Sequence, residues 1–212
     1  MPGKDLIIYG ASNPSVLKIL DALNRETLLW NLVGFIDDTP EMQDSEFYGF
    51  PVLGGRDRIE SFDPENTFFF NNVFGSMPAR KKVGEILKQL GCQLTSLISP
   101  DSDLAFVEVG KDVAIEQRVS IDALVKIGDH CCVKRSASVG HEVVMENYVF
   151  VGPGATVCGR VRLREGVYVG AGSCIKQELE IGSFSVIGAG AVVIADVPPN
   201  TTVVGNPAKS RE

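Results

Sequence analysis

Hydrophobic residues recur every six positions along the second half of the chain, a period that belongs neither to a helix nor to an alternating strand. From residue 109 onward, every sixth position is aliphatic or methionine through fifteen repeats without an insertion. These positions hold Val109, Ile115, Ile121, Ile127, Val133, Val139, Met145, Val151, Val157, Leu163, Val169, Ile175, Ile181, Ile187 and Val193. A second register, four residues after each, is mostly small or β-branched. Each hexad therefore predicts a short strand with two inward residues, followed by a turn.

The repeat predicts a prism of stacked coils. Three hexads close a triangular coil of 18 residues, and fifteen hexads make five coils. Neighbouring coils satisfy one another's backbone groups in parallel ladders, so no coil is stable alone. The period of six excludes a heptad coiled coil, and its regularity excludes a β-sandwich, whose strands need longer and less even spacings. The spacing does not determine the hand of the coil.

The first half alternates between strand and helix patterns in the way of a small parallel α/β unit. Apolar runs at 5–9, 30–36 and 67–74 predict strands, with a further short strand near 50–53. Residues 13–26 and 77–91 predict helices, the first with Pro14 in its first turn. The pattern breaks near Pro100, so we expect an α/β domain at 1–97 and a β-helix domain at 98–212.

Ligands of parallel α/β units bind beyond the carboxyl ends of the strands. Those ends carry Gly10, Ala11, Ser12, Asp37, Asp38 and Gly75. The first turn, "GASNPS", lacks the later glycines of a GxGxxG dinucleotide motif, so a half-sized nucleotide-binding unit is favoured. The alternative, in which Gly10 only makes the turn and both aspartates are solvated, stays open.

Composition and charge narrow the function classes. The net charge of -7 argues against binding nucleic acid or an anionic membrane surface. No apolar run has the length of a signal peptide or a membrane span, so we expect a cytoplasmic protein without membrane insertion. The five cysteines form no CxxC pair, and we expect them to be small buried residues.

His141 and Glu142 follow Val139 as the second and third residues of a turn. This position lies outside the core, so a core histidine is excluded, whereas a solvated turn residue remains an alternative. Gly159 lies one coil further, and Ala171 and Ala189 take the same turn position on the neighbouring edge. Small residues there leave room for a long, thin ligand and expose backbone N–H groups. A histidine beside a carboxylate suits general base catalysis.

The hexad repeat, the "VGHE" segment at 139–142 and the "VVGNPAK" segment at 203–209 resemble the hexapeptide-repeat acyltransferases. The resemblance implies a left-handed parallel β-helix. The order of the two domains, an α/β unit followed by a β-helix, resembles that of the bacterial UDP-amino-sugar N-acetyltransferases. These enzymes are the PglD-like branch of the sugar O/N-acyltransferases. That branch implies acetyl-CoA as co-substrate and a nucleotide-linked amino sugar as acceptor, with a UDP-4-amino sugar favoured. It also implies a homotrimer with each site between two β-helices.

The resemblance also implies residue roles. His141 maps on the catalytic base and Glu142 on its partner acid. The nucleotide-sugar contacts map on Gly10, Ala11, Ser12, Asp37, Asp38 and Gly75. Acetyl-CoA contacts map on Phe150, Gly159, Ala171 and Ala189. Three positions differ from the family: "GASNPS" replaces "GASGHG", Phe150 replaces a coenzyme-holding histidine, and Lys134 replaces an asparagine.

Functions other than N-acetylation are also known or conceivable for a chain with this repeat. O-acetylation of a sugar or sialic acid stays open, because the sequence does not separate amine from hydroxyl acceptors. A non-catalytic binding or scaffold protein also stays open. A γ-type carbonic anhydrase needs three zinc-binding histidines, and the chain has two. No metal site is therefore expected. Cys158 and Cys174 are weak candidates for a nucleophile, because neither has an evident base nearby.

Overall fold

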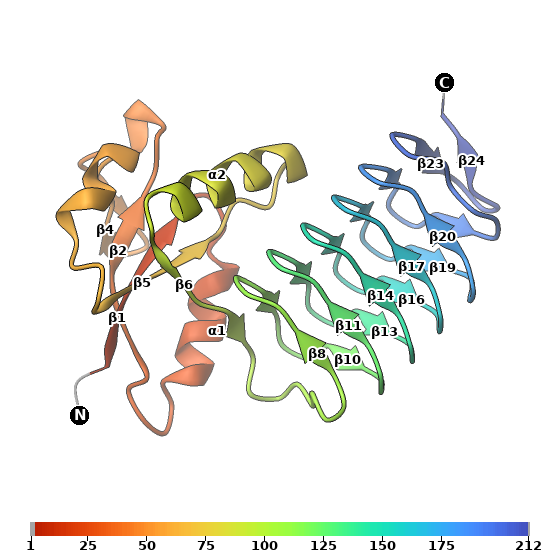
Figure 1. Cartoon of the computed structure of the whole chain (residues 1–212), viewed down its shortest axis with the longest axis horizontal. Coiled ribbons are helices and arrows are strands. Elements are labelled where there is room, and N and C mark those ends of the chain that lie inside the picture. The colour runs from red at the N-terminus through yellow and green to blue at the C-terminus, as the bar shows by residue number, and fades with distance from the viewer. Residues whose placement is uncertain (1–2, 212) are drawn as a thin grey trace. The chain divides into compact units, whose positions relative to one another are not determined.

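The computed structural model describes residues 3–211, and the chain divides into two compact units, 1–97 and 98–212 (Figure 1). The first unit is built on a parallel sheet in the order β2 (Trp30–Ile36), β1 (Lys4–Tyr9), β5 (Thr67–Asn71) and β6 (Gln93–Leu94). The order places the carboxyl ends of β1, β2 and β5 side by side. The two short strands β3 (Glu46–Phe47) and β4 (Phe50–Pro51) pair as a hairpin.

Two α-helices connect the strands of this unit. Helix α1 (Ser15–Leu23) follows Pro14. Helix α2 (Met77–Gln89) is capped by Ser76, whose hydroxyl accepts a hydrogen bond from the N–H of Ala79. Val83 and Leu87 of α2 share a buried cluster with Ile7 and Phe69 of the sheet. Two 3₁₀ helices, η1 (Pro40–Met42) and η2 (Arg56–Ser61), lie between β2 and β5 in the chain. The sequence pattern did not indicate β6 or the 3₁₀ helices.

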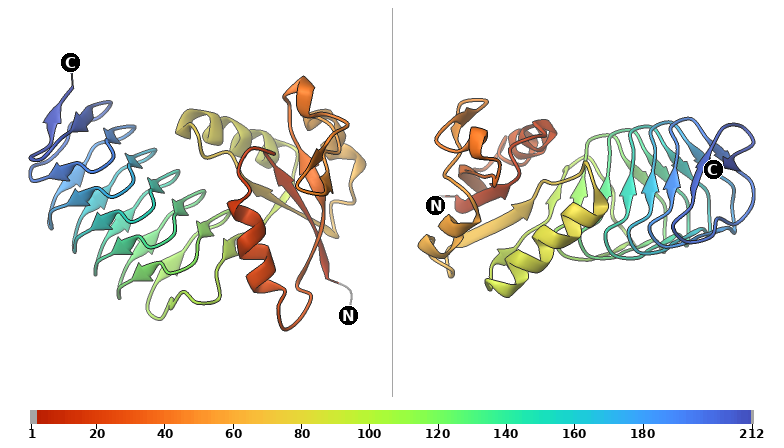
Figure 2. Two further views of the ribbon diagram at one scale, coloured as in Figure 1. Left: turned by 180° about the vertical axis from the view of Figure 1, so that it is seen from behind. Right: turned by 90° about the horizontal axis from the view of Figure 1, so that it is seen from above.

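The second unit is a parallel β-helix with three sheets. Their strands are β10-β13-β16-β19-β22, β20-β17-β14-β11-β8 and β24-β23-β21-β18-β15-β12-β9-β7. The bounds are β7 (Leu97–Ile98), β8 (Glu108–Val109), β9 (Ala114–Ile115), β10 (Ser120–Ile121), β11 (Lys126–Ile127), β12 (Cys132–Val133), β13 (Ser138–Val139), β14 (Val144–Met145), β15 (Phe150–Val151), β16 (Thr156–Val157), β17 (Arg162–Leu163), β18 (Tyr168–Val169), β19 (Cys174–Ile175), β20 (Glu180–Ile181), β21 (Val186–Ile187), β22 (Val192–Val193), β23 (Thr202–Val204) and β24 (Lys209–Ser210). Figure 2 shows the coils stacked one behind another.

Each of the fifteen hexad aliphatics is the last residue of a two-residue strand. Strand neighbours are 18 residues apart, as in the pairs Ser138 with Thr156 and Val139 with Val157. Most of these side chains are buried in one continuous core, and only Val109 and Ile121, of the first coil, are partly exposed. Each fully buried valine or isoleucine stabilises the fold by about 1.5–3 kcal/mol. The predicted period and register are therefore confirmed.

The turns, like the strands, have a regular backbone conformation and hydrogen bonds from coil to coil. The third turn residue of successive coils has a left-handed conformation, with φ of 59° at Glu142, 61° at Arg160 and 66° at Glu178. Its N–H donates to the coil before, as from Arg160 to the carbonyl of His141 (2.9 Å) and from Glu178 to that of Gly159 (3.1 Å). Turn side chains therefore stack in columns along each edge of the prism.

Two of these edges carry the candidate site. We call the turns at 122–124, 140–142, 158–160 and 176–178 the histidine edge, and those at 152–154, 170–172 and 188–190 the alanine edge. Neither helix in the described part of the chain has the length and hydropathy needed to cross a bilayer.

Candidate active site

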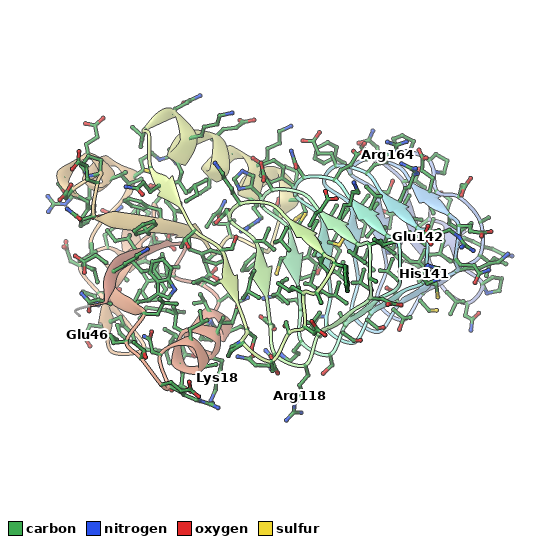
Figure 3. The ribbon with its side chains drawn as sticks, turned by 60° about the horizontal axis from the view of Figure 1, so that its bottom comes forward. Lys18, Glu46, Arg118, His141, Glu142 and Arg164 are labelled. Carbon is green, nitrogen blue, oxygen red and sulfur yellow. The ribbon has the colours of Figure 1, made fainter. Side chains whose placement is uncertain are left out.

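His141 lies on the histidine edge with its ring half exposed, and its Nδ1 is 2.9 Å from Oε2 of Glu142 (Figure 3). A carboxylate accepts only, so this contact assigns the ring proton to Nδ1 in the neutral histidine. The lone pair is then on Nε2, which points away from Glu142. The pair thus has the geometry of a base with an orienting acid.

Gly159 lies directly against the imidazole. A Cβ built on Gly159 would be 2.6 Å from Nε2 of His141 and 2.8 Å from Cε1, so any side chain at this position would displace the ring. Within residues 3–211, the N–H of Gly159 donates no hydrogen bond, whereas that of Lys111, at the equivalent turn position, donates to Asp129. The histidine edge therefore places the imidazole of His141 and an unused backbone donor in adjacent coils.

The alanine edge has the small, exposed surface that the sequence predicted. Ala171 and Ala189 are exposed, and neither N–H donates a hydrogen bond to another described residue. Phe150 does not belong to this strip. It lies on strand β15, is buried, and stacks on Tyr168 with ring centroids 4.6 Å apart. Its predicted contact with a coenzyme stays a prediction, without support from the turn geometry.

Two of the cysteines have raised thiol pKa values, which disfavour the nucleophilic thiolate. Burial raises the pKa of the Cys158 thiol, and the neighbouring Cys174 raises it further, so Cys158 is a neutral thiol near pH 7. Burial likewise raises the pKa of Cys92 to about 11. The expectation of five buried cysteines is wrong for Cys92, Cys158 and Cys174, which are only partly buried, because they lie at turns or on the outer side of a strand.

The two aspartates after β2 are both engaged within the α/β unit. Asp37 accepts from the N–H of Ala11 (2.8 Å) and of Thr39 (2.9 Å). Asp38 accepts from the hydroxyl of Tyr9 (2.5 Å) and forms an ion pair with Arg56. Each carboxylate oxygen has two lone pairs, so both groups keep some capacity to accept from a ligand.

Asp38 is held as an anion. Burial by itself would raise its pKa, but hydrogen bonds from Arg56 and Tyr9 outweigh burial and hold the pKa below its ordinary value. Burial and the same hydrogen bond raise the pKa of Tyr9, which therefore stays a donor. The sequence pattern did not indicate that Tyr9 and Arg56 contact Asp38. Tyr9 is the last residue of the first strand and Arg56 follows "GG", and neither position is by itself a signal of binding.

Asn72 stabilises the turn that follows β1, and the sequence pattern did not indicate this role. Its amide donates to the carbonyls of Gly10 and Asn13, both at 3.0 Å. Gly10 has a φ of 104°, which favours glycine. Ser12 is exposed, and a Cβ at Gly75 would contact nothing within 4 Å. The hydrogen bonds from Ala11 to Asp37 and from Asn72 to Gly10 thus join the ends of β1, β2 and β5 at one edge of the sheet.

Two further polar groups of the β-helix are structural. His130 lies 2.8 Å from the buried Asp112 and stacks on Tyr148, with ring centroids 4.5 Å apart. Lys134, which replaces the family's asparagine, is buried with its ammonium 2.6 Å from Glu116. Among residues 3–211, no group of three or more His, Cys, Asp or Glu side chains is placed to hold a metal ion.

Solved structures resemble the chain over nearly its whole length. No protein-family model matches the sequence, and no curated protein matches it either. The acetyltransferase domain of PglB from Neisseria gonorrhoeae FA1090, solved with acetyl coenzyme A, is 29% identical, with a TM-score of 0.89 over 99% of this chain and 100% of that one. The chain therefore resembles the hexapeptide-repeat acyltransferases in structure over nearly its whole length.

Two other solved structures show the same resemblance. PerB from Caulobacter crescentus, solved with CoA and GDP-perosamine, is 25% identical, with a TM-score of 0.88 over 98% of this chain and 97% of that one. WeeI from Acinetobacter baumannii AYE is 25% identical, with a TM-score of 0.85 over 97% and 99%. The predicted resemblance to hexapeptide-repeat sugar acetyltransferases and the prediction of an enzyme are confirmed.

Proposed function

We propose that this acyltransferase moves the acetyl group of acetyl-CoA to the amine of a nucleotide-linked amino sugar. The observation that carries the proposal is the His141–Glu142 pair set against Gly159, with unused N–H donors beside it. Acetyl-CoA as co-substrate agrees with the PglB structure, and an acceptor of this class agrees with the GDP-perosamine of PerB. A UDP-4-amino sugar is the acceptor we favour, and the cytoplasm is the expected compartment.

In this mechanism, His141 takes a proton from the sugar amine through Nε2 while the amine nitrogen attacks the thioester carbon. Glu142 holds the Nδ1 proton and stabilises the imidazolium that forms. The N–H of Gly159 donates to the oxygen that becomes negative. The carbon–sulfur bond then breaks, and the imidazolium gives its proton to the leaving sulfur, so that CoA is released as a thiol. General base catalysis contributes on the order of 10²–10⁴-fold, and one oxyanion donor on the order of 10²–10³-fold.

An acetyl-transfer assay tests the proposal. Free thiol released from acetyl-CoA is followed with UDP-linked and GDP-linked 4-amino sugars as acceptors, and the acetylated product is identified by mass spectrometry. Turnover with an amino sugar, and none with the matching hydroxyl sugar or with sialic acid, is expected. Transfer to hydroxyl acceptors alone would establish the O-acetyltransferase alternative. Absence of turnover with every acceptor would favour a non-catalytic binding protein.

The proposal includes a left-handed coil, a Rossmann-like α/β unit for the nucleotide and a homotrimer. Likeness to the solved acetyltransferases supports the first two. The trimer would supply a wall for the exposed histidine edge, with the alanine edge of a second copy facing it. We expect light scattering to give about three times the chain mass of 22.8 kDa. A single chain mass at assay concentrations would contradict this assembly.

A further prediction concerns Asp38. If its carboxylate accepts from the nucleotide sugar, Asp38→Asn is expected to raise KM for the sugar nucleotide about tenfold, the effect of losing one charge-assisted hydrogen bond. KM for acetyl-CoA should change less than twofold. Asp5→Asn, at the opposite end of β1, is the matched control and should change neither. Equal effects of Asp38→Asn on both KM values would remove the aspartate from sugar recognition.

A further inference from the structure

A column of charges runs along the histidine edge behind the catalytic pair. Oε2 of Glu142, which contacts His141, also lies 3.7 Å from Nη1 of Arg160. The other side of the Arg160 guanidinium is held by Glu178, whose Oε1 accepts from Nε at 3.0 Å and from Nη2 at 2.7 Å. The four residues therefore form one continuous chain of contacts over three coils.

The backbone of the turns makes this column. Glu142, Arg160 and Glu178 are 18 residues apart, share the left-handed turn position, and lie on backbones that are hydrogen-bonded coil to coil. Their side chains therefore start from fixed and neighbouring points. The rotamers of the side chains are not fixed in this way, because all three are about half exposed.

An exposed carboxylate without a second partner would rotate among several rotamers, and the Nδ1 of His141 would then lose its acceptor for part of the time. Arg160 limits that rotation because it attracts the same oxygen that faces the ring. Glu178 in turn holds Arg160 through two hydrogen bonds to its guanidinium.

We propose that Arg160 and Glu178 are positioning residues that keep His141 in the tautomer with its proton on Nδ1 and its lone pair on Nε2. The proposal rests on the proposed role of His141 as the base. Neither residue touches the reacting atoms. They act through Glu142, and the expected effect on turnover is modest because half-exposed ion pairs are individually weak.

The prism contains a matched control on another edge. Glu146, Arg164 and Glu180 form a second Glu–Arg–Glu chain, with contacts of 2.7 Å from Arg164 to Glu146 and 2.9 Å to Glu180. No histidine contact with this chain is found among the described residues. Figure 3 labels Arg164 together with His141 and Glu142. Arg164→Ala therefore removes the same kind of ion pair without touching the His141 contacts.

The ring nitrogens provide a readout that needs no activity. The chain has two histidines, so long-range ¹H–¹⁵N spectra of the whole protein contain two imidazoles, and His130, against Asp112, is an internal reference. At about pH 9, where imidazoles are neutral, Arg160→Ala and Glu178→Gln should shift the His141 signals from the Nδ1–H form toward a mixture of tautomers. Arg160→Lys should largely restore the wild-type spectrum, and Arg164→Ala should leave it unchanged.

Kinetics gives the second readout. Arg160→Ala is expected to lower kcat about two- to fivefold and to leave both KM values within twofold. A factor of this size corresponds to the interaction free energy of one exposed ion pair. Unchanged His141 tautomers in both Arg160→Ala and Glu178→Gln would overturn the proposal, whatever the activity. Absence of acetyl transfer by the wild-type protein would instead overturn the proposed function, and the spectra would still decide the positioning role.

Discussion

Replacing His141 with alanine is expected to lower kcat by about 10²- to 10⁴-fold, the range of general base catalysis. The thermal midpoint should stay within about 2 °C, because the ring lies on a turn and is half exposed. The measurement is thiol release from acetyl-CoA at saturating acceptor, with circular dichroism melting of the same samples. A fall in kcat without loss of the fold would assign the effect to chemistry.

The control for this prediction is Lys111→Ala, which changes an exposed residue at the equivalent turn position of another edge. It should leave both kcat and melting unchanged. Glu142→Ala should lower kcat less than His141→Ala, because it removes the orienting acid and leaves the base in place. Near-normal turnover of His141→Ala would end the general-base assignment and leave proximity and the donors beside Gly159 to explain catalysis.

Gly159→Ala is expected to lower kcat about 10²-fold through displacement of the imidazole. The new methyl group would stand 2.6 Å from Nε2 and 2.9 Å from Cδ2, far inside normal contact, so the ring must move. A displacement of about 1 Å in a catalytic group can reduce the rate by that factor. The backbone of Gly159 does not need the left-handed region, and the obstacle is a flexible side chain, so the protein should fold normally.

A double-mutant cycle separates displacement of the ring from any other effect of the new methyl group. In a His141→Ala background the ring is gone, so Gly159→Ala should cause little further loss if it acts by displacing His141. Full additivity of the two substitutions would show instead that the alanine disturbs something other than the histidine. A crystal structure of Gly159→Ala with His141 in its original position and normal turnover would contradict the prediction outright.

Much of the β-helix could be read from the sequence because its physics is local and repeated. An inward side chain every six residues closes a triangular coil, and the same choice repeated fifteen times leaves one register in which all of them are buried. The position of His141 on a turn, and of Gly159 in the next coil, follows from counting by 18. The likeness to solved acetyltransferases confirms the family resemblance, whereas the roles of individual residues stay predictions.

The sequence by itself determined the period, the strand register and the edge on which His141 lies, because backbone pairing and burial leave one solution. The tertiary structure decided which long side chains meet. The α/β unit has no repeat, so its sequence does not show which distant residues meet. Examples are the contacts of Asp38 with Tyr9 and Arg56, and the hydrogen bonds from the side-chain amide of Asn72. The contact of Arg160 with Glu142 depends on rotamers of half-exposed side chains, which spacing leaves open. The contact of the His141 ring with Gly159 also depends on a side-chain rotamer. Backbone geometry places the two residues in adjacent coils, and the rotamer of His141 brings the ring against Gly159.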